Sequence, residues 1–186
     1  TIAGILDAGV NVIDLGMTGT EEVYFATSYH QVLGGIEVTA SHNPINYNGL
    51  KLVKEHSKPI SADDGLDEIQ ALAESGKFSA VNDKGQLQLL TDKSAYINHV
   101  IDFIDIKKLK PLKIVINSGN GSAGPVVDLI VDKLVQAKAP IEVIKLHHQP
   151  DGSFPNGIPN PMILANREST QKAVIQHKAD LGIAFD

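Results

Sequence analysis

Short apolar runs alternate with longer amphipathic stretches along most of the chain. Runs of about five apolar residues are typical of buried parallel strands, and the longer stretches have the length and spacing of crossover helices. The alternation predicts an α/β fold, with strands at 10–15, 35–39, 50–53, 113–117, 141–146 and 181–185. Helices are predicted at 21–32, 61–74, 92–103, 122–135 and 168–177.

Capping and turn-forming residues mark where some of these elements begin and end. Thr20 and Ser61 are predicted N-caps, because their side-chain oxygens can accept a hydrogen bond from the first turn of a helix. Gly76 is predicted to end the second helix. The basic segment 107–110, followed by Pro111, is the predicted linker, so two α/β units meet near that proline.

The composition excludes several classes of protein. The 186 residues include 16 Lys or Arg and 22 Asp or Glu, which gives a net charge of −6. The sequence contains no long basic run that could bind nucleic acid. No apolar run approaches the roughly 20 residues that cross a bilayer, and no export signal is recognisable. We therefore expect no nucleic-acid or membrane partner and a cytoplasmic location. The absence of cysteine removes disulfides, thiolate metal sites and cysteine nucleophiles.

The segment 39–44 is the first candidate for chemistry. Ser41 follows the predicted strand 35–39, and the carboxyl end of a parallel strand is where α/β proteins present reactive groups. Asn43-Pro44 is also an ordinary turn dipeptide, so a simple turn remains an alternative. A serine hydrolase is disfavoured, because the nucleophile elbow needs Gly-x-Ser-x-Gly and Thr39 and Asn43 stand at the glycine positions.

The glycine-rich segment 119–124 is a rival candidate. It matches Gly-x-Gly-x-x-Gly between a predicted strand and a predicted helix, the context of a dinucleotide-binding turn. Such a site needs an acidic residue near the end of the next strand, but that strand ends in lysine and histidine, and its one acid, Glu142, stands at its beginning. A tight packing turn is the simpler interpretation. His147 and His148 directly follow this predicted strand, and adjacent side chains of an extended segment point to opposite faces, which disfavours a shared metal ion.

Several segments together carry a resemblance to a known family. Residues 39–44, read as Thr-Ala-Ser-His-Asn-Pro, resemble the active-site serine loop of the α-D-phosphohexomutases. Residues 12–17 are similar to the strand before that loop, 48–51 to the element after it, and 181–186 to the lead-in to the family's metal loop. The resemblance implies two consecutive three-layer α/β/α domains with mixed, mostly parallel sheets, at 1–108 and 109–186, both truncated.

The resemblance also implies roles for individual residues. Ser41 is expected to carry a phosphoryl group and to pass it to a hydroxyl of a hexose phosphate substrate, with Mg²⁺ as cofactor. His42 corresponds to a positioning donor, Asn43 to a substrate-binding residue, and Lys51 to a general acid/base or a direct cation that also contacts substrate. Asp186 corresponds to the first carboxylate of an Asp-Gly-Asp-x-Asp-Arg metal loop, beside a ligand oxygen from Ser41.

Within this family, the look of residues 14–25 favours a phosphomannomutase, which interconverts mannose 6-phosphate and mannose 1-phosphate through a bisphosphorylated sugar and supplies GDP-mannose and surface polysaccharide synthesis. A phosphoglucomutase is the alternative within the family, and a dinucleotide-binding domain built on 119–124 is the alternative from another class. The chain is expected to be an interior piece of a protein two to three times longer, to need the remaining domains as partners, and to be inactive alone.

Overall fold

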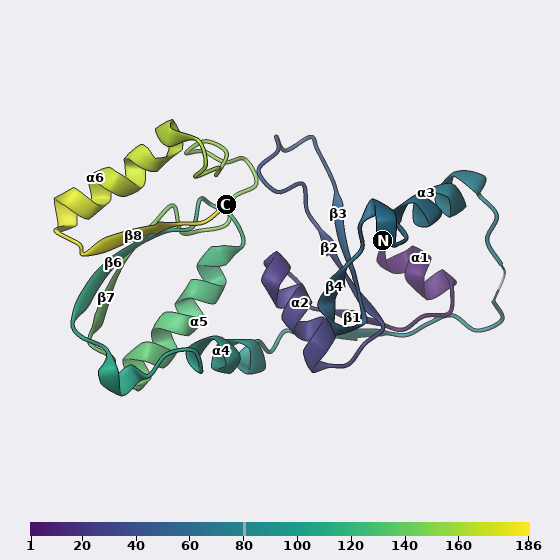
Figure 1. The fold of residues 1–186 in the computed structure, drawn as a ribbon, viewed down its shortest axis with the longest axis horizontal. Coiled ribbons are helices and arrows are strands. Elements are labelled where there is room, and N and C mark those ends of the chain that lie inside the picture. The colour runs from purple at the N-terminus through teal and green to yellow at the C-terminus, as the bar shows by residue number, and fades with distance from the viewer. Residues whose placement is uncertain (80) are drawn as a thin grey trace. The chain divides into compact units, whose positions relative to one another are not determined.

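The computed structural model describes residues 1–79 and 81–186, which form two compact units (Figure 1). Unit 1 is made of Thr1–Glu37 and Lys51–Lys93, and unit 2 of Val38–Leu50 and Ser94–Asp186. The segment between residues 38 and 50 therefore belongs to unit 2, although the chain on both sides of it belongs to unit 1. The predicted domain boundary at 108/109 stays a prediction.

In the residues that the structure describes, unit 1 contains two small sheets and three helices. Strands β1 (Val12–Asp14) and β5 (Leu87–Leu89) pair in parallel. The second sheet has the order β2-β3-β4 and pairs β3 with β4 in antiparallel fashion. Its strands are β2 (Gly34–Val38), β3 (Leu50–Lys54) and β4 (Lys58–Pro59), and the helices are α1 (Ile2–Asp7), α2 (Thr20–Tyr29) and α3 (Leu66–Ser75), with short 3₁₀ turns η1 (Glu55–Ser57) and η2 (Ala62–Asp64).

Helix α2 begins one residue earlier than predicted, at Thr20. Gly19 is the N-cap, and its N–H donates to Oε1 of Glu22 at 2.9 Å, which completes half of a capping box. The prediction that Thr20 is the N-cap was wrong, because Thr20 is the first residue of the helix itself. Gly35 on β2 lets α2 approach, since a side chain there would overlap the Thr27 hydroxyl.

The predicted helix at 61–74 is interrupted near its start. Ser61 makes no side-chain capping bond and precedes only the turn η2, so its assignment as the cap of a continuous helix was wrong. Gly65, with φ 113°, separates that turn from α3. A left-handed residue cannot continue an α-helix, which is the physical reason for the break. Gly76, with φ 60°, ends α3 as predicted.

Unit 2 is a layered α/β unit. Strands β6 (Leu112–Asn117), β7 (Ile141–Leu146) and β8 (Leu181–Ala184) form a parallel sheet in the order β7-β6-β8. Helices α5 (Ala123–Gln136) and α6 (Glu168–His177) lie on opposite faces of this sheet (Figure 1). The unit is completed by α4 (Ser94–Ile101) and the 3₁₀ turns η3 (Ile106–Lys108) and η4 (Leu164–Arg167). The predicted α/β class is confirmed.

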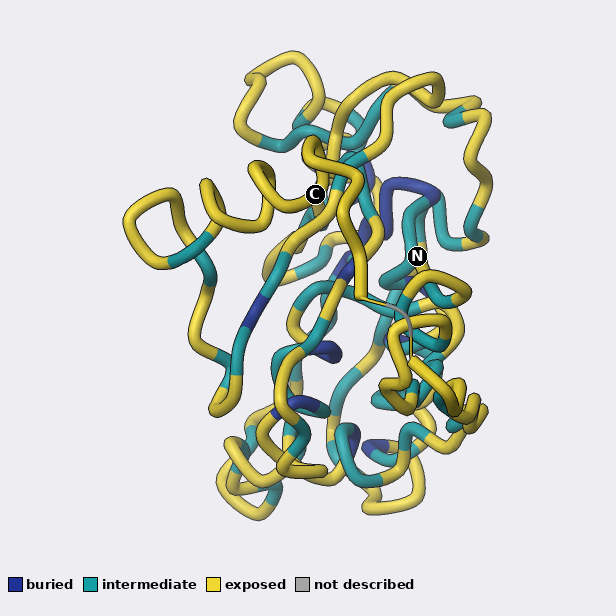
Figure 2. The backbone as a smooth tube through the Cα atoms, turned by 90° about the vertical axis from the view of Figure 1, so that its right-hand side faces the viewer, coloured by how far each residue is buried: buried dark blue, intermediate teal, exposed yellow. Residues whose placement is uncertain are grey.

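Buried side chains form a small core in each unit, and the buried stretches of backbone are correspondingly short (Figure 2). In unit 1 the buried apolar residues are Val23 and Val53, contributed by α2 and β3. In unit 2 they lie on both sides of the sheet and on α4, at Ile97, Val115, Val127, Leu134 and Ala173. Each unit therefore packs its helices against its own strands.

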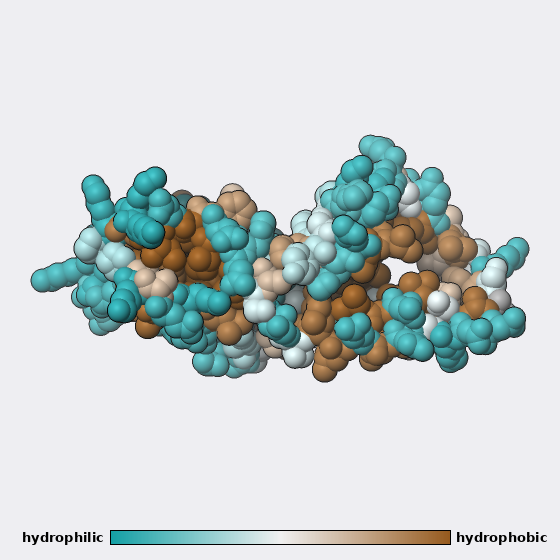
Figure 3. Space-filling model, turned by 90° about the horizontal axis from the view of Figure 1, so that it is seen from below, coloured by the Kyte–Doolittle hydropathy of each residue, from teal (hydrophilic) through white to brown (hydrophobic). Residues whose placement is uncertain are grey.

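Apolar side chains are also exposed on several strands. Hydrophobic surface is visible on the face shown in Figure 3, and the exposed apolar residues of the strands are Ile36, Val38, Leu50, Leu87, Leu89, Leu181 and Ile183. The two strands β5 and β8 lie at sheet edges. Among the residues described, no helix combines the length and the apolar character that crossing a membrane requires.

Candidate functional site

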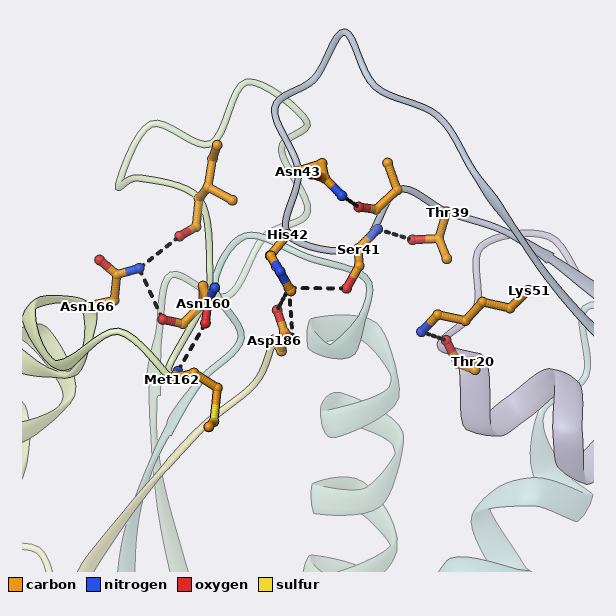
Figure 4. A network of polar contacts seen from close by, with 12 residues as sticks. Thr20, Thr39, Ser41, His42, Asn43, Lys51, Asn160, Met162, Asn166 and Asp186 are labelled. Carbon is orange, nitrogen blue, oxygen red and sulfur yellow. Dashed lines mark hydrogen bonds and ion pairs between the residues drawn. The ribbon is translucent and has the colours of Figure 1, made fainter. Parts of the chain in front are cut away.

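The loop between β2 and β3 presents the predicted serine (Figure 4). The base of the loop is closed by the Thr39 N–H, which donates to the Gly49 carbonyl at 2.9 Å. Inside it, the Asn43 amide donates from Nδ2 to the Ala40 carbonyl at 2.6 Å, and the Asn43 backbone N–H donates to the same oxygen at 3.1 Å. The side chain of Asn43 thus shapes the loop, and its predicted role in binding substrate stays a prediction.

Ser41 is held in a strained backbone conformation. Its φ is 53°, in the left-handed region that a residue with a side chain enters at a cost of about 1 kcal/mol or more. The Ser41 N–H donates to the hydroxyl of Thr39 at 2.9 Å, which holds this conformation locally. Strain retained at an exposed hydroxyl indicates a site whose geometry matters for function.

Within unit 2, His42 links Ser41 to Asp186 (Figure 4). Its Nδ1 lies 3.1 Å from Oδ1 and 3.2 Å from Oδ2 of Asp186, and 3.4 Å from Oγ of Ser41. An Nδ1–H donated to the carboxylate also fixes the tautomer of the ring. Three predicted site residues that are up to 145 positions apart in sequence are therefore brought together around one ring nitrogen.

Lys51 belongs to unit 1, where it lies on β3 beside the start of α2. Its Nζ donates to the hydroxyl of Thr20 at 3.0 Å (Figure 4). The hydroxyl of Thr20, predicted to cap the helix, instead accepts this bond from the lysine. Lys51 is thus held by a residue of its own unit.

Two family models match most of the chain. The model described as "Phosphoglucomutase/phosphomannomutase, alpha/beta/alpha domain I" matches residues 1–80, and the corresponding model for domain II matches residues 94–186. The chain belongs to the phosphoglucomutase/phosphomannomutase family. This confirms the resemblance inferred from the serine loop and its flanking segments.

Relatives in this phosphoglucomutase/phosphomannomutase family are similar over nearly the whole chain. A protein named phosphomannomutase from Salmonella montevideo is 57% identical over 185 residues, and one of the same name from Vibrio cholerae serotype O1 is 57% identical over 183. Each match covers 98% of this chain, which spans 41% and 40% of the two relatives. A solved structure of a family protein from Burkholderia thailandensis superposes with a TM-score of 0.82 at 30% identity, over 98% of this chain and 39% of its own.

The residues around His42 have the type of donor atoms that a hard cation binds, but too few of them. Ser41 offers a hydroxyl or phosphate oxygen and Asp186 a carboxylate, the donor types that Mg²⁺ prefers. Within residues 1–79 and 81–186, no cluster of three or more His, Cys, Asp or Glu side chains could hold a metal ion. The chain thus supplies two residues with oxygen donors, Ser41 and Asp186, one on each side of His42. A full octahedral shell needs further ligands.

The glycine-rich turn of this family member is used for packing. A side chain on Gly119 would overlap Pro159, and one on Gly124 would overlap the carbonyl oxygen of His148. The cavity beside the turn measures about 180 Å³, whereas ligand pockets usually exceed about 300 Å³. Strand β7 also ends without an acidic residue for a ribose. These observations favour the structural interpretation of 119–124 over a dinucleotide site.

A hydrogen-bonded Ser-His-Asp set in unit 2 resembles a catalytic triad, but its serine is buried. His148 Nε2 lies 2.8 Å from Asp128 Oδ1, and its Nδ1 lies 3.4 Å from Ser118 Oγ. Hydrogen bonds from Lys145 and His148 hold the pKa of the Asp128 carboxyl below its usual range. Ser118, however, is only 1% exposed, so no substrate carbonyl can reach its hydroxyl. We regard this set as a structural tie between α5 and the end of β7.

The sequence did not identify a second polar group, in unit 1. Glu37 on β2 and Glu22 on α2 are buried carboxylates, 8% and 5% exposed. Glu37 accepts a hydrogen bond from the hydroxyl of Thr18, and Glu22 forms an ion pair with Lys93. One signal for Glu37 was present in the sequence. It stands between the apolar residues Ile36 and Val38 of a predicted strand, and strict alternation places its side chain on the face opposite to theirs.

Proposed function

We propose that this chain carries the phosphoserine loop of a phosphomannomutase that interconverts mannose 6-phosphate and mannose 1-phosphate. The observation that carries the proposal is the strained, exposed Ser41 beside His42 and Asp186, in a chain that belongs to this family. Two relatives 57% identical to it are named phosphomannomutase, which supports mannose over glucose. A phosphoglucomutase is the alternative, and supply of mannose 1-phosphate to GDP-mannose synthesis is the proposed metabolic role.

In the proposed reaction, Ser41 carries the phosphoryl group between turnovers. The bond between Ser41 Oγ and phosphorus breaks as a hydroxyl oxygen of the hexose monophosphate bonds to the same phosphorus. The resulting bisphosphate turns over in the site and returns its other phosphate to Ser41. Such a transfer needs placement in line and neutralisation of charge, more than covalent assistance from the protein.

The remaining residues have roles that follow from their positions. Nδ1 of His42 faces both Ser41 and Asp186, so the ring can orient the serine oxygen. Asp186 and Ser41 are the residues that would hold Mg²⁺, which when bound supplies positive charge to the transferring phosphoryl group. Lys51 serves as general acid/base or as a direct cation for the sugar hydroxyl. Asn43 keeps the loop in shape through Ala40.

Intact-mass analysis and a coupled assay on the full-length protein test this proposal. We expect a phosphoryl group on Ser41, and we expect Ser41→Ala to lower kcat by roughly four orders of magnitude or more, as removal of a covalent nucleophile does. Ser153→Ala, another exposed serine in a loop of unit 2, is the matched control and should keep full activity. A Ser41→Ala protein with ordinary turnover would overturn the proposal.

The same assay addresses the substrate. The full-length protein should turn over mannose 6-phosphate with a higher kcat/KM than glucose 6-phosphate, and the reverse preference would favour the phosphoglucomutase alternative. The 186-residue chain alone should show no turnover, because its two oxygen donors do not complete a metal site. Activity of the isolated chain would show that Ser41, His42 and Lys51 suffice without further domains.

A further inference from the structure

Glu37 is a buried carboxylate for which the proposed mechanism has no use. It is 8% exposed, although Ile36 and Val38 on either side of it are exposed. Burying a carboxylate is costly unless other groups compensate its charge and hydrogen bonding. Oε2 of Glu37 accepts a hydrogen bond from the hydroxyl of Thr18 at 2.9 Å, which compensates one oxygen in part.

The register of β2 and β3 places Glu37 opposite Lys51. The two strands are neighbours in one sheet, and the Thr39 N–H donates to the Gly49 carbonyl at the loop end. Counting two residues inward on each antiparallel strand reaches Glu37 and Lys51. Directly opposite residues of such a pair share one face, with their Cβ atoms about 5 Å apart.

A second observation supports the same register at the other end of the strands. A Cβ built on Gly34 would meet the carbonyl oxygen of Val53 and the Cα of Lys54. Gly34 opposite Lys54 is the pairing that Glu37 opposite Lys51 requires. The shared face points to α2, because a side chain on Gly35 would meet Thr27 and Val23 of that helix.

The loop before α2 connects the two charges. Glu37 binds Thr18 in this loop, and Lys51 binds Thr20, two residues further on at the first position of α2. Lys93 fixes the same loop, since its Nζ donates to the Met17 carbonyl at 2.8 Å. The Lys51 ammonium is therefore bound at the first residue of α2, and the Glu37 carboxylate is bound two residues earlier in the chain.

The charges that face Glu37 come from two elements, α2 and β3. Burial raises the pKa of the Glu37 carboxyl, and Glu22 and Glu21 on α2 raise it further, whereas the Thr18 hydrogen bond and Lys51 on β3 lower its pKa. Glu22 is itself paired with Lys93. Lys51 thus contributes to keeping the carboxylate charged in a buried position.

We propose that Glu37 is a positioning residue that holds the Lys51 ammonium in place for phosphoryl transfer. The inference rests on the proposed function of Lys51, and Glu37 itself touches no substrate. A buried carboxylate beside a candidate functional lysine is where such a role is expected. Thr18 then orients the carboxylate, and Thr20 receives the lysine.

A double-mutant cycle in the full-length protein tests the proposal. Glu37→Gln keeps an oxygen for Thr18 and removes the charge, and we expect kcat to fall about tenfold with KM within about twofold, the pattern of a lost transition-state interaction. Lys51→Met should lower kcat further, and adding Glu37→Gln to it should change nothing more. Glu21→Gln, a neighbouring acid on the exposed face of α2, is the matched control and should retain kcat.

The outcomes separate the inference from the function on which it rests. An equal loss from Glu37→Gln in both backgrounds would mean that Glu37 acts independently of Lys51, and the inference would fail while the function stood. Full activity of Lys51→Met would remove the role of the lysine, and the inference with it, whereas an inert Ser41→Ala would still support the function. Full activity of Glu37→Gln alone would also overturn the inference.

A measurement that needs no turnover completes the test. The Glu37 carboxyl of full-length protein labelled with ¹³C at glutamate Cδ is identified by the signal that Glu37→Gln removes. Lys51→Met should raise the pKa of this carboxyl further, because the lysine charge lowers it, and Glu22→Gln should lower it. A Glu37 titration that does not respond to Lys51→Met would show that the two charges do not interact and would overturn the inference.

Discussion

Two polar groups in this chain differ in burial and in what their contacts achieve. In unit 2, His42 and Asp186 form a pair whose side chains are 44% and 42% exposed. In unit 1, Lys93 and Glu22 form a pair whose side chains are 17% and 6% exposed. Water screens the first pair, so it adds little to stability, whereas the second was desolvated on folding and neither partner can be lost cheaply.

The two groups differ in how their side chains meet solvent and in what they hold in place. The exposed group leaves its oxygens and its ring open to solvent, and the strained backbone at Ser41 lies beside it. The buried group is largely closed to solvent, and its contacts fix the loop before α2 through the Met17 carbonyl and the Gly19 N–H. Residues that act on a ligand and residues that hold those residues should therefore respond differently to substitution.

The largest stability effect is expected at Lys93. Lys93→Met leaves the buried Glu22 carboxylate without its ionic partner, which costs about 3 kcal/mol in comparable cases. Urea unfolding of the full-length protein measures the difference. The control is Lys84→Met, which breaks the exposed ion pair with Asp7 and should leave the unfolding free energy nearly unchanged, because water screens that pair. Equal losses in the two variants would abolish the distinction between the groups.

A smaller effect, on rate instead of stability, is expected at His42. His42→Asn should lower kcat of the full-length protein about tenfold, the loss of one positioning contact worth about 1.4 kcal/mol. The unfolding free energy should change by less than about 0.5 kcal/mol, because the pair with Asp186 is exposed. His177→Asn, at the exposed end of α6, is the control. A His42 variant that unfolds easily would place this residue with the buried group.

The smallest effect is a pH dependence at Glu37. Burial raises the pKa of its carboxyl in the folded protein above the ordinary value of 4.5. Its favourable contribution is therefore fully present below pH 4.5 and is lost as pH rises through the folded pKa. Glu37→Gln should then be as stable as the parent protein at pH 4 and more stable by a few degrees in Tm at pH 7. Thermal scans across this range measure the difference, and a variant less stable at pH 7 would contradict it.

Much of the fold was predictable because its elements follow strong local patterns. Strand β7 and helix α6 have the predicted bounds, β3 and β6 differ by one residue at one end, and β2 differs by one residue at each end. The strand β5 was missed, because three residues with exposed side chains carry no strong alternation and exist as a strand only through pairing with β1. A local stretch of sequence does not reveal a pairing between strands that lie far apart along the chain.

The candidate site divides in the same way. Ser41, His42 and Asn43 are neighbours in sequence, so their motif was readable directly. The contact between His42 and Asp186 was not readable, since 144 residues separate them and the loop and the end of β8 meet only in the folded unit 2. Glu37 was missed because a charged residue in a strand is usually exposed.

The sequence by itself determined the α/β class, most strands and helices, and the segment that presents Ser41, because apolar periodicity and turn residues act over a few positions. Only the tertiary structure decided which face of β2 is buried. Gly35 leaves room for α2 on the face that carries Glu37, so a carboxylate is enclosed while Ile36 and Val38 are exposed. Close packing between a helix and a strand, and not the hydropathy of the strand, sets that choice.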